Sequence, residues 1–369
     1  MKNLSFTSVN DFRIFLKEEK SNKILIICGE KSFKKSGANK LLAGLLINKN
    51  VGFYFKKFPH PNHVELQEII NQIKLFSPDL IIAIGGGSVL DYAKIANVLT
   101  ESKKLEEEIV NSTYNVKKKF AKLVAIPTTA GSGAEVTPNA VIYVNKIKYS
   151  VENEKLKPDF FFLIPDLVIG ATKKIKSSAG FDAIAQAIES LISKKSNDVS
   201  VDFAKKSLNI SLKYFLDYLN NPSNENTSAM CLAANLSGKA ISISKTTAPH
   251  AVSYPFTSIF NVSHGHAVSL TLNKFLKFNF INLEHATCNF NLKNRYKTMF
   301  NISKTNDLSS FDKYLINLKK AANLENNFVK LGIDIKKDYQ KIISGVNILR
   351  LSNNPIELKN KDLQQIIQN

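Results

Sequence analysis

Asp79-Leu-Ile-Ile-Ala-Ile-Gly-Gly-Gly-Ser-Val-Leu-Asp-Tyr-Ala-Lys94 is the stretch that decides the fold. Residues 79–84 have the character of a short buried strand, and they run directly into three glycines and a helical pattern. Glycines let backbone amides approach a ligand closely, while the following helix points its N-terminus at the same place. Because the spacing is neither GxGxxG nor that of a Walker loop, the turn alone predicts either a phosphate cradle or a tight connection.

A second loop of the same kind follows another short strand. Residues 123–126 are apolar, and they precede Pro127-Thr-Thr-Ala-Gly-Ser-Gly-Ala-Glu-Val-Thr137. Paired hydroxyls and glycines make such a loop able to wrap a pyrophosphate. Because both loops would open at the carboxyl edge of one parallel sheet, together they favour dinucleotide binding.

The pattern of apolar residues along the chain changes near residue 170. Before it, short β-branched runs alternate with amphipathic stretches, as in a parallel sheet covered by helices, with a hairpin expected around Asn145-Lys146. Beyond Gly170 the strand signals vanish and helical periodicity continues to the end. We therefore predict an α/β dinucleotide-binding domain of residues 1–170 and an all-helical domain of residues 171–369 that binds metal and substrate.

The second half carries a set of candidate metal ligands. Asp182 and Gln186 stand four residues apart on a predicted helix, so their side chains leave the same face one turn apart. His250 and His264 can close the cage from elsewhere in the chain. Oxygen and imidazole ligands together suit a divalent first-row metal such as iron or zinc.

The net charge of +19 raises the question of a nucleic-acid partner. The excess is nearly all lysine and is spread along the chain, whereas Arg13, Arg295 and Arg350 are the only arginines. No basic patch interleaved with aromatic residues is present, so we predict no nucleic-acid partner. A cleft in this positive field would instead attract an anionic substrate.

Other sequence features point to a cytoplasmic protein without a membrane partner. No run approaches the roughly 20 apolar residues of a membrane span, and the first residues lack the apolar segment of a secretory signal. Cys28, Cys231 and Cys288 are far apart and lack CxxC spacing. We therefore expect buried thiols rather than disulfides or a thiolate metal site.

Four segments, in the same order and over nearly the whole chain, resemble the iron-containing (group III) alcohol dehydrogenases. They are residues 85–94, 127–137, 180–190 and 250–264. The resemblance implies a Rossmann-like domain followed by an all-helical domain, the dehydroquinate synthase-like architecture, with NAD(P)H and a divalent metal, iron or zinc, in the cleft between them. It also implies an NAD(P)-dependent alcohol dehydrogenase or aldehyde reductase.

Carried over residue by residue, the family's metal ligands fall on Asp182, His250 and His264. Gln186 stands where the family usually has a histidine, and an amide oxygen is a weaker ligand than imidazole. Tyr254 stands where many relatives carry another histidine near the nicotinamide. The cofactor contacts carried over are Gly86, Gly87, Ser88, Asp91, Thr128, Thr129, Ser132, Asn62, Asn139 and Lys148.

Within the family, residues 180–186, 245–255 and 263–267 look most like the phosphonoacetaldehyde reductase branch. That resemblance implies reduction of phosphonoacetaldehyde to 2-hydroxyethylphosphonate, a reaction of phosphonate biosynthesis. Two alternatives stay open. One is an iron-type alcohol dehydrogenase acting on another small aldehyde or alcohol, and the other is a metal-free binding protein of the same fold.

In the implied reaction, the metal polarises the aldehyde oxygen and the nicotinamide supplies a hydride. His266 and Tyr254 are candidates for the proton relay to the alkoxide, the alternative being that they only line or orient the pocket. Lys245, Thr246 and Thr247 are candidates for phosphonate binding, the alternative being an ordinary helix end. The residues leave open both a homodimer and the choice between NADH and NADPH.

Overall fold

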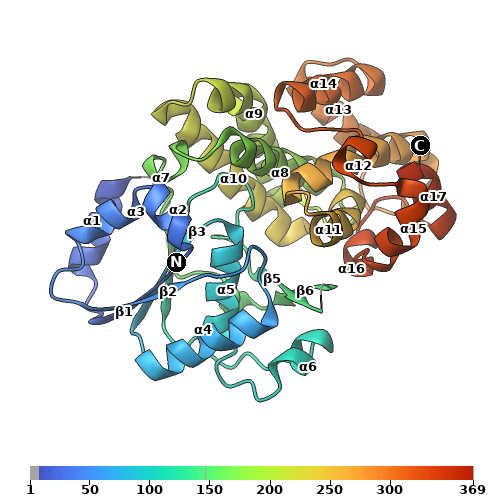
Figure 1. The fold of residues 1–369 in the computed structure, drawn as a ribbon. Coiled ribbons are helices and arrows are strands. Elements are labelled where there is room, and N and C mark those ends of the chain that lie inside the picture. The colour runs from blue at the N-terminus through green and yellow to red at the C-terminus, as the bar shows by residue number, and fades with distance from the viewer. Residues whose placement is uncertain (1–7, 146, 369) are drawn as a thin grey trace. The chain divides into compact units, whose positions relative to one another are not determined.

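The computed structural model describes residues 8–145 and 147–368, and the chain forms two compact units (Figure 1). One unit contains the described residues up to Thr172 together with Ser223–Cys231. The other contains Lys173–Pro222 and the described residues from Leu232 onward. The single boundary predicted near residue 170 takes no account of the segment 223–231, which groups with the first unit.

The first unit is built on a five-stranded parallel sheet in the order β2-β1-β3-β4-β7. Its strands are β1 (Lys23–Cys28), β2 (Asn50–Phe55), β3 (Leu80–Gly85), β4 (Lys122–Pro127) and β7 (Phe160–Phe161). The predicted α/β fold with a parallel N-terminal sheet is confirmed. The strand order reverses between β1 and β3, and ligands of such sheets bind outside the carboxyl ends of the strands at this point.

Helices cover both faces of the sheet. They are α1 (Val9–Glu18), α2 (Glu30–Lys35), α3 (Ala38–Ala43), α4 (His63–Phe76), α5 (Gly87–Val98), α6 (Leu105–Val110) and α7 (Asp166–Ile169). Alternate residues of β1 point to opposite faces. Leu25 and Ile27 join the core beneath α4, α5 and α6, whereas Ile24 and Ile26 join the core beneath α1, α2, α3 and α7. Burial on both faces explains the continuous apolar runs in the sequence.

A separate antiparallel pair consists of β5 (Asn139–Val144) and β6 (Ile147–Glu152), and η1 (Glu154–Leu156) follows it. The predicted hairpin is confirmed for its strands. Asn145 adopts the left-handed conformation, with φ of 49°, and Lys146 lies outside the described residues.

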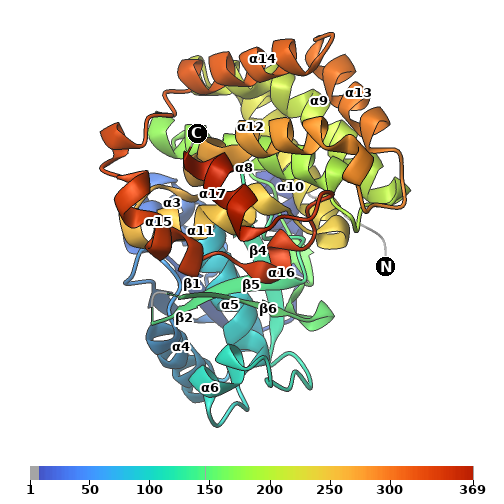
Figure 2. The same cartoon turned by 90° about the vertical axis from the view of Figure 1, so that its right-hand side faces the viewer.

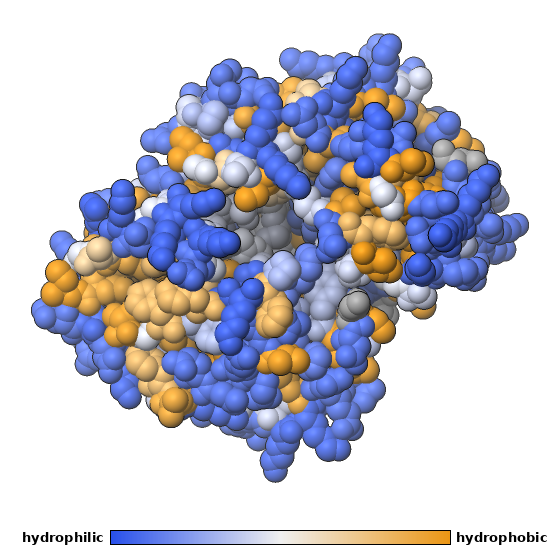
Figure 3. All heavy atoms as spheres, viewed as in Figure 1, coloured by the Kyte–Doolittle hydropathy of each residue, from blue (hydrophilic) through white to orange (hydrophobic). Residues whose placement is uncertain are grey.

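Most of the face in Figure 3 is hydrophilic, in keeping with a lysine-rich chain. The edge strand β2 exposes two apolar side chains, Phe53 and Phe55, whose rings stack with centroids 5.7 Å apart. Exposed strand edges are places where another chain can pair. The homodimer left open by the sequence stays a prediction.

Helices make up the second unit, as predicted (Figure 2). They are α8 (Lys173–Ile192), α9 (Asp198–Asn220), α10 (Asn224–Ser244, which begins in segment 223–231), α11 (Ala248–Phe260), α12 (His264–Ile281), α13 (Leu292–Ser303), α14 (Leu308–Ala321), α15 (Ile335–Ser344), α16 (Ile348–Leu351) and α17 (Asn360–Gln368), with the short turns η2 (Leu283–His285) and η3 (Val329–Leu331). Nearly every residue of α8 from Lys176 onward is buried, and α8 packs against α9 and α12. All helices in the described part of the chain fall short of the length and apolarity that crossing a bilayer requires.

Candidate active site

The buried face of α8 carries three polar side chains one turn apart. Asp182, Gln186 and Glu189 follow one another at intervals of four and three residues, and all three are almost fully buried. Buried carboxylates and amides require partners, because leaving one without a hydrogen bond or a counter-charge is costly. The partners come from α10, α11 and α12.

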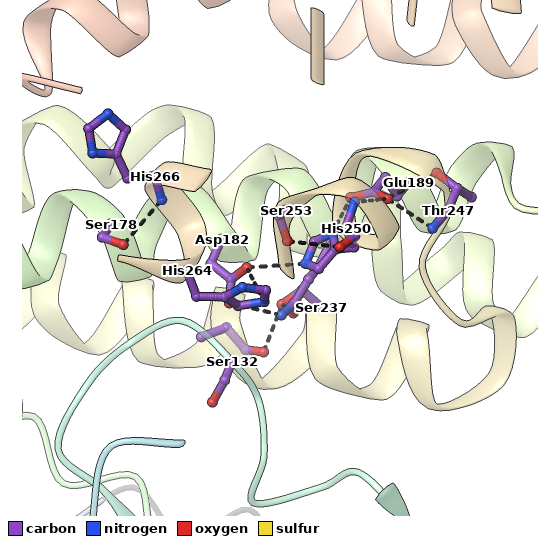
Figure 4. Close-up of polar contacts among 12 residues, drawn as sticks. Ser132, Ser178, Asp182, Glu189, Ser237, Thr247, His250, Ser253, His264 and His266 are labelled. Carbon is purple, nitrogen blue, oxygen red and sulfur yellow. Dashed lines mark hydrogen bonds and ion pairs between the residues drawn. The ribbon is translucent and has the colours of Figure 1, made fainter. Parts of the chain in front are cut away.

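Asp182, His250 and His264 form a compact group of metal-ligating side chains (Figure 4). One ligand atom from each lies within 4.8 Å of the others. Asp182 Oδ1 is 3.2 Å from His250 Nε2 and 3.9 Å from His264 Nε2. Two imidazoles and one carboxylate that converge in this way match the donor set of an iron or zinc site.

A glycine places His264 beside Asp182. A Cβ atom on Gly265 would lie 2.0 Å from the backbone oxygen of Ser178 and 2.8 Å from Asp182 Cβ. The first turn of α12 is therefore pressed against α8 at the level of the carboxylate, and only glycine permits this approach. Close packing of α12 on α8 thus explains why a glycine stands between the two histidines of residues 264–266.

Glu189 holds the other histidine from behind. Its side chain is fully buried, and Oε2 contacts His250 Nδ1. Oε1 accepts from the backbone N–H and the hydroxyl of Thr247, each at 2.9 Å, and from the backbone N–H of His250 at 3.3 Å. The carboxylate therefore caps the start of α11 and fixes the imidazole with Nε2 toward Asp182. Glu189 lies inside the motif of residues 180–190, but sequence reasoning gave it no role.

The two carboxylates change the protonation of His250. Burial disfavours charge on its ring, but Glu189 and Asp182 outweigh burial and raise the pKa of His250 to about 9. The two carboxylates therefore favour the charged form of the imidazole.

The amide of Gln186 faces the ligand group with its nitrogen. Nε2 donates to Asp182 Oδ2 at 3.1 Å, and Oε1 accepts from the hydroxyl of Ser237 at 2.9 Å. The hydroxyl of Ser237 also lies 2.9 Å from the backbone oxygen of Ala234. A metal ligand would need the amide oxygen on the side of Asp182, so ligation by Gln186 stays a prediction.

The two candidates for the proton relay are placed differently. The Tyr254 ring centroid lies 6.0 Å from that of His264. Burial raises the pKa of the Tyr254 phenol, and the neighbouring Arg350 guanidinium acts in the opposite direction. His266 points away from the ligand group in Figure 4, and its Nε2 lies 2.7 Å from the backbone oxygen of Glu325. This geometry favours an orienting role for His266, and its relay role stays a prediction.

The three candidates for phosphonate binding precede α11. The hydroxyl of Thr247 donates to Glu189 Oε1, and the backbone oxygen of Thr246 accepts from Asn353 Nδ2 at 3.2 Å. Lys245 is half-buried and adopts the left-handed conformation, with φ of 61°. Of the three, Thr247 therefore already hydrogen-bonds to Glu189, which holds His250, and the predicted role in phosphonate binding stays a prediction.

Both predicted phosphate loops lie at the same edge of the sheet in the first unit. Gly85 pairs with Pro127 in register, and the backbone N–H of Thr128 donates to the oxygen of Gly85 at 2.9 Å. A Cβ atom on Gly87 would lie 2.9 Å from the hydroxyl oxygen of Ser132, so the start of α5 and the second loop touch. The structure thus brings the glycine turn of residues 85–87 together with Thr128 and Ser132. Gly86 caps α5, Ser88 lies in its first turn, and Thr129 lies beside Gly86.

A buried lysine fastens the second loop to α5. Lys94 Nζ donates to the backbone oxygens of Ala134 and Asn139 and to the hydroxyl of Thr137. Burial lowers the pKa of Lys94 to about 8 and raises that of nearby Asp91 to about 6. Lys94 ends the glycine motif without a role that the sequence predicts, and only its contacts reveal one.

The remaining predicted cofactor residues surround the hairpin. Asn139 begins β5, Lys148 lies opposite Tyr143 on β6, and Asp91 accepts from the backbone N–H of Val141. Asn62 caps α4 by accepting from the backbone N–H of Glu65 at 2.9 Å, and it bridges to Tyr143. These residues lie close to one another in the first unit, and their contacts with a cofactor stay predictions.

Comparison with known families identifies the class. The model of the iron-containing alcohol dehydrogenases matches residues 7–165, and the C-terminal model of the Fe-containing alcohol dehydrogenase family matches residues 176–369. The chain therefore belongs to the iron-containing alcohol dehydrogenase family, oxidoreductases that act on CH–OH groups with NAD(P)H and iron. The resemblance predicted from the motifs is confirmed, and with it the class of enzyme and cofactor.

Among individual relatives, phosphonoacetaldehyde reductase of Streptomyces viridochromogenes is 29% identical over 57% of this chain. That match spans 56% of the relative, little more than half its length. 1-Propanol dehydrogenase of Citrobacter freundii is 30% identical over 72% of this chain and 69% of its own.

Solved structures share the fold. Sulfoacetaldehyde reductase from Bifidobacterium kashiwanohense in complex with NAD+ superimposes with a TM-score of 0.87, at 23% identity, over 99% of this chain and 95% of its own. Iron-containing alcohol dehydrogenase from Thermotoga maritima superimposes with a TM-score of 0.82, at 23% identity, over 99% of this chain and 96% of its own.

Proposed function

We propose that this protein is a metal-dependent NAD(P)H oxidoreductase that reduces phosphonoacetaldehyde to 2-hydroxyethylphosphonate. The observation that carries the catalytic part is the convergence of Asp182, His250 and His264 within 4.8 Å. The substrate is supported by the Gln186 and His-Gly-His features of the sequence and by the phosphonoacetaldehyde reductase relative.

In this proposal, the side chains of the second unit hold and orient the reacting groups. Asp182, His250 and His264 would bind the cation, and Glu189 keeps Nε2 of His250 directed at it. When bound, the cation polarises the aldehyde oxygen, and NAD(P)H supplies the hydride. Tyr254 lies beside His264, where its hydroxyl can pass a proton toward the alkoxide product.

The first unit would bind the dinucleotide. Backbone amides at the start of α5 and the hydroxyls of Thr128 and Ser132 lie at one edge of the sheet, where a pyrophosphate meets several donors and a helix N-terminus. Lys94 holds the second loop in place for this purpose.

Turnover of a panel of aldehydes tests the proposed substrate. We expect the iron- or zinc-loaded protein to oxidise NADH or NADPH with phosphonoacetaldehyde at a kcat/KM at least ~10-fold above that with propanal or butanal, because only the phosphonate gains charge-assisted contacts. A preference for the uncharged aldehydes would instead favour the second candidate, an alcohol dehydrogenase for short alcohols, as the 1-propanol dehydrogenase relative suggests. Protein without bound metal and without cofactor oxidation would point to a binding protein.

Substitution of Gln186 tests its ligation. If the amide turns by half a rotation on metal binding, its oxygen faces the cation and its nitrogen donates to Ser237, whose hydroxyl proton is then free for Ala234. We expect Gln186→Ala to weaken metal affinity ~10-fold and Gln186→His to restore or exceed it, measured by chelator competition. Unchanged affinity in Gln186→Ala would make the glutamine a pocket residue only.

A further inference from the structure

A segment near the C-terminus, residues 345–354, runs along α11. A Cβ atom on Gly345 would lie 3.1 Å from Pro255 Cβ, and the backbone N–H of Asn347 donates to the oxygen of Ala251 at 3.3 Å. Ala251 and Pro255 are four residues apart and share one face of α11. The segment therefore lies over that face.

Hydrogen bonds also fix the other end of the segment, at residues 353–354. Asn353 Nδ2 donates to the oxygen of Thr246 at 3.2 Å, and its backbone oxygen accepts from the N–H of Lys194 at 3.0 Å. Asn354 and Asn279 exchange a pair of amide hydrogen bonds at 2.8 and 3.1 Å in a buried position. Because both ends are held, the helix α16 between them is a fixed platform.

Arg350 projects from this platform toward Tyr254. Tyr254 is three residues after Ala251 and therefore belongs to the face that the segment covers. The side chain of Asn347 caps α16 by accepting from the backbone N–H of Arg350 at 2.9 Å. The guanidinium lies near the phenol, on which it acts as a charge and as a side-chain hydrogen-bond partner. Tyr254 is thus in contact with Arg350, and its ring lies beside that of His264, one of the metal ligands.

Arginine is a rare choice in this chain. Of 50 basic residues only three are arginine, so lysine is its ordinary surface cation. Arg13 is exposed, and Arg295 lies over the ring of Phe290 at 4.7 Å. Arg350 is the arginine beside Tyr254, whose ring lies 6.0 Å from that of His264. Its planar fork can donate to two oxygens of one tetrahedral anion at once, which the single ammonium of lysine cannot.

We propose that Arg350 binds the anionic group of the substrate, a phosphonate or sulfonate on the carbon next to the aldehyde. This inference rests on the proposed function as an aldehyde reductase. In such a short substrate the anion and the aldehyde oxygen are close together, so the residue that binds the anion must lie near the metal ligands. Arg350 meets that condition with a hydrogen-bonding fork on a fixed platform.

Substitution of Arg350 tests the assignment through substrate preference. We expect Arg350→Gln to lower the ratio of kcat/KM for phosphonoacetaldehyde to that for propanal ~100-fold, mainly through KM, and Arg350→Lys to lower it ~10-fold. The same ratio for sulfoacetaldehyde should fall less, because a sulfonate carries one negative charge and a phosphonate up to two. An equal or larger fall for sulfoacetaldehyde would overturn the phosphonate as the preferred anion.

The control is Arg13→Gln, which removes an exposed arginine of the first unit and should leave every ratio unchanged. A parallel loss on all three aldehydes, or no change in the ratio, would overturn the assignment. Calorimetric titration with methylphosphonate separates this inference from the proposed function, because it needs no turnover. Binding to the metal-loaded protein that weakens at least ~10-fold in Arg350→Gln supports the anion site even if no aldehyde is reduced. Binding equal to that of the unsubstituted protein refutes it.

Discussion

Asp182→Asn should remove the metal and lower kcat/KM for any aldehyde substrate by a factor on the order of a thousand. Asp182 is the only carboxylate in the ligand group, and its Oδ1 is 3.2 Å from His250 Nε2 and 3.9 Å from His264 Nε2. Asparagine keeps the shape of the side chain but loses the charge that draws a divalent cation into a buried site. Metal content per chain, measured by mass spectrometry, and NAD(P)H oxidation check the result.

The control for this substitution is Asp202→Asn, which changes an exposed aspartate paired with Lys206 on α9. It should retain metal and activity. Affinity for NAD(P)H should also persist in Asp182→Asn, because the predicted dinucleotide loops belong to the first unit. Full metal content in Asp182→Asn would mean that the ion is held elsewhere, and the proposed catalytic site would be wrong.

The periodicity of apolar residues is sufficient to predict the fold class, because the burial of each strand or helix sets its own pattern of apolar residues. Strands β1, β3 and β4 are buried on both faces, so they appear in the sequence as short runs of isoleucine, leucine, valine and alanine bounded by turns. The helical half shows a different period, and the change falls near residue 170. The segment 223–231 gave no such signal, because the start of one long helix, α10, belongs to a different unit from its end.

The ligand group could be predicted because its residues are chemically distinctive. A carboxylate and two histidines in the family's spacing suggest a cation site through both their residue types and their positions. Glu189, Lys94 and Arg350 could not be assigned in the same way. Each is an ordinary charged residue in the sequence, and its role depends on what the fold places opposite it: His250 for Glu189, the second loop for Lys94 and Tyr254 for Arg350.

The orientation of the Gln186 amide is another feature that the sequence does not predict. Its position one turn after Asp182 follows from the sequence, and so does its presence at the site. Which end of the amide faces the carboxylate depends on Ser237, which comes from α10 and lies 51 residues away in the chain. Local spacing therefore predicts the neighbours of a ligand, whereas its hydrogen-bond partners require the packed helices.

Substitutions of Glu189 are expected to have the second large effect. Two of them separate its role as the cap of α11 from its role in orienting His250. Glu189→Ala leaves the buried N–H groups of Thr247 and His250 without their acceptor and removes the counter-charge of the imidazole. We expect it to lower the free energy of unfolding by about 3–5 kcal/mol, measured by urea denaturation in the absence of metal.

Glu189→Gln should be milder for stability but severe for metal binding. The amide oxygen can replace Oε1 as the acceptor for Thr247, which turns the amide nitrogen toward His250 Nδ1. A donor at that position requires an unprotonated Nδ1, so the proton moves to Nε2, the nitrogen that faces Asp182. We therefore expect metal affinity to fall ~10- to 100-fold by chelator competition, with dinucleotide affinity unchanged.

The chain offers a matched control in Glu284, which pairs with His285 at 3.6 Å on the surface of the same unit. Glu284→Gln also removes the charge from a glutamate beside a histidine, but both partners are well exposed, so unfolding should change by less than about 1 kcal/mol and metal affinity not at all. If Glu189→Gln binds metal as tightly as the unsubstituted protein, Glu189 serves only as the cap of α11. If its metal affinity falls while its unfolding free energy stays close to normal, the carboxylate acts through the orientation of His250, and a stability defect cannot account for the loss.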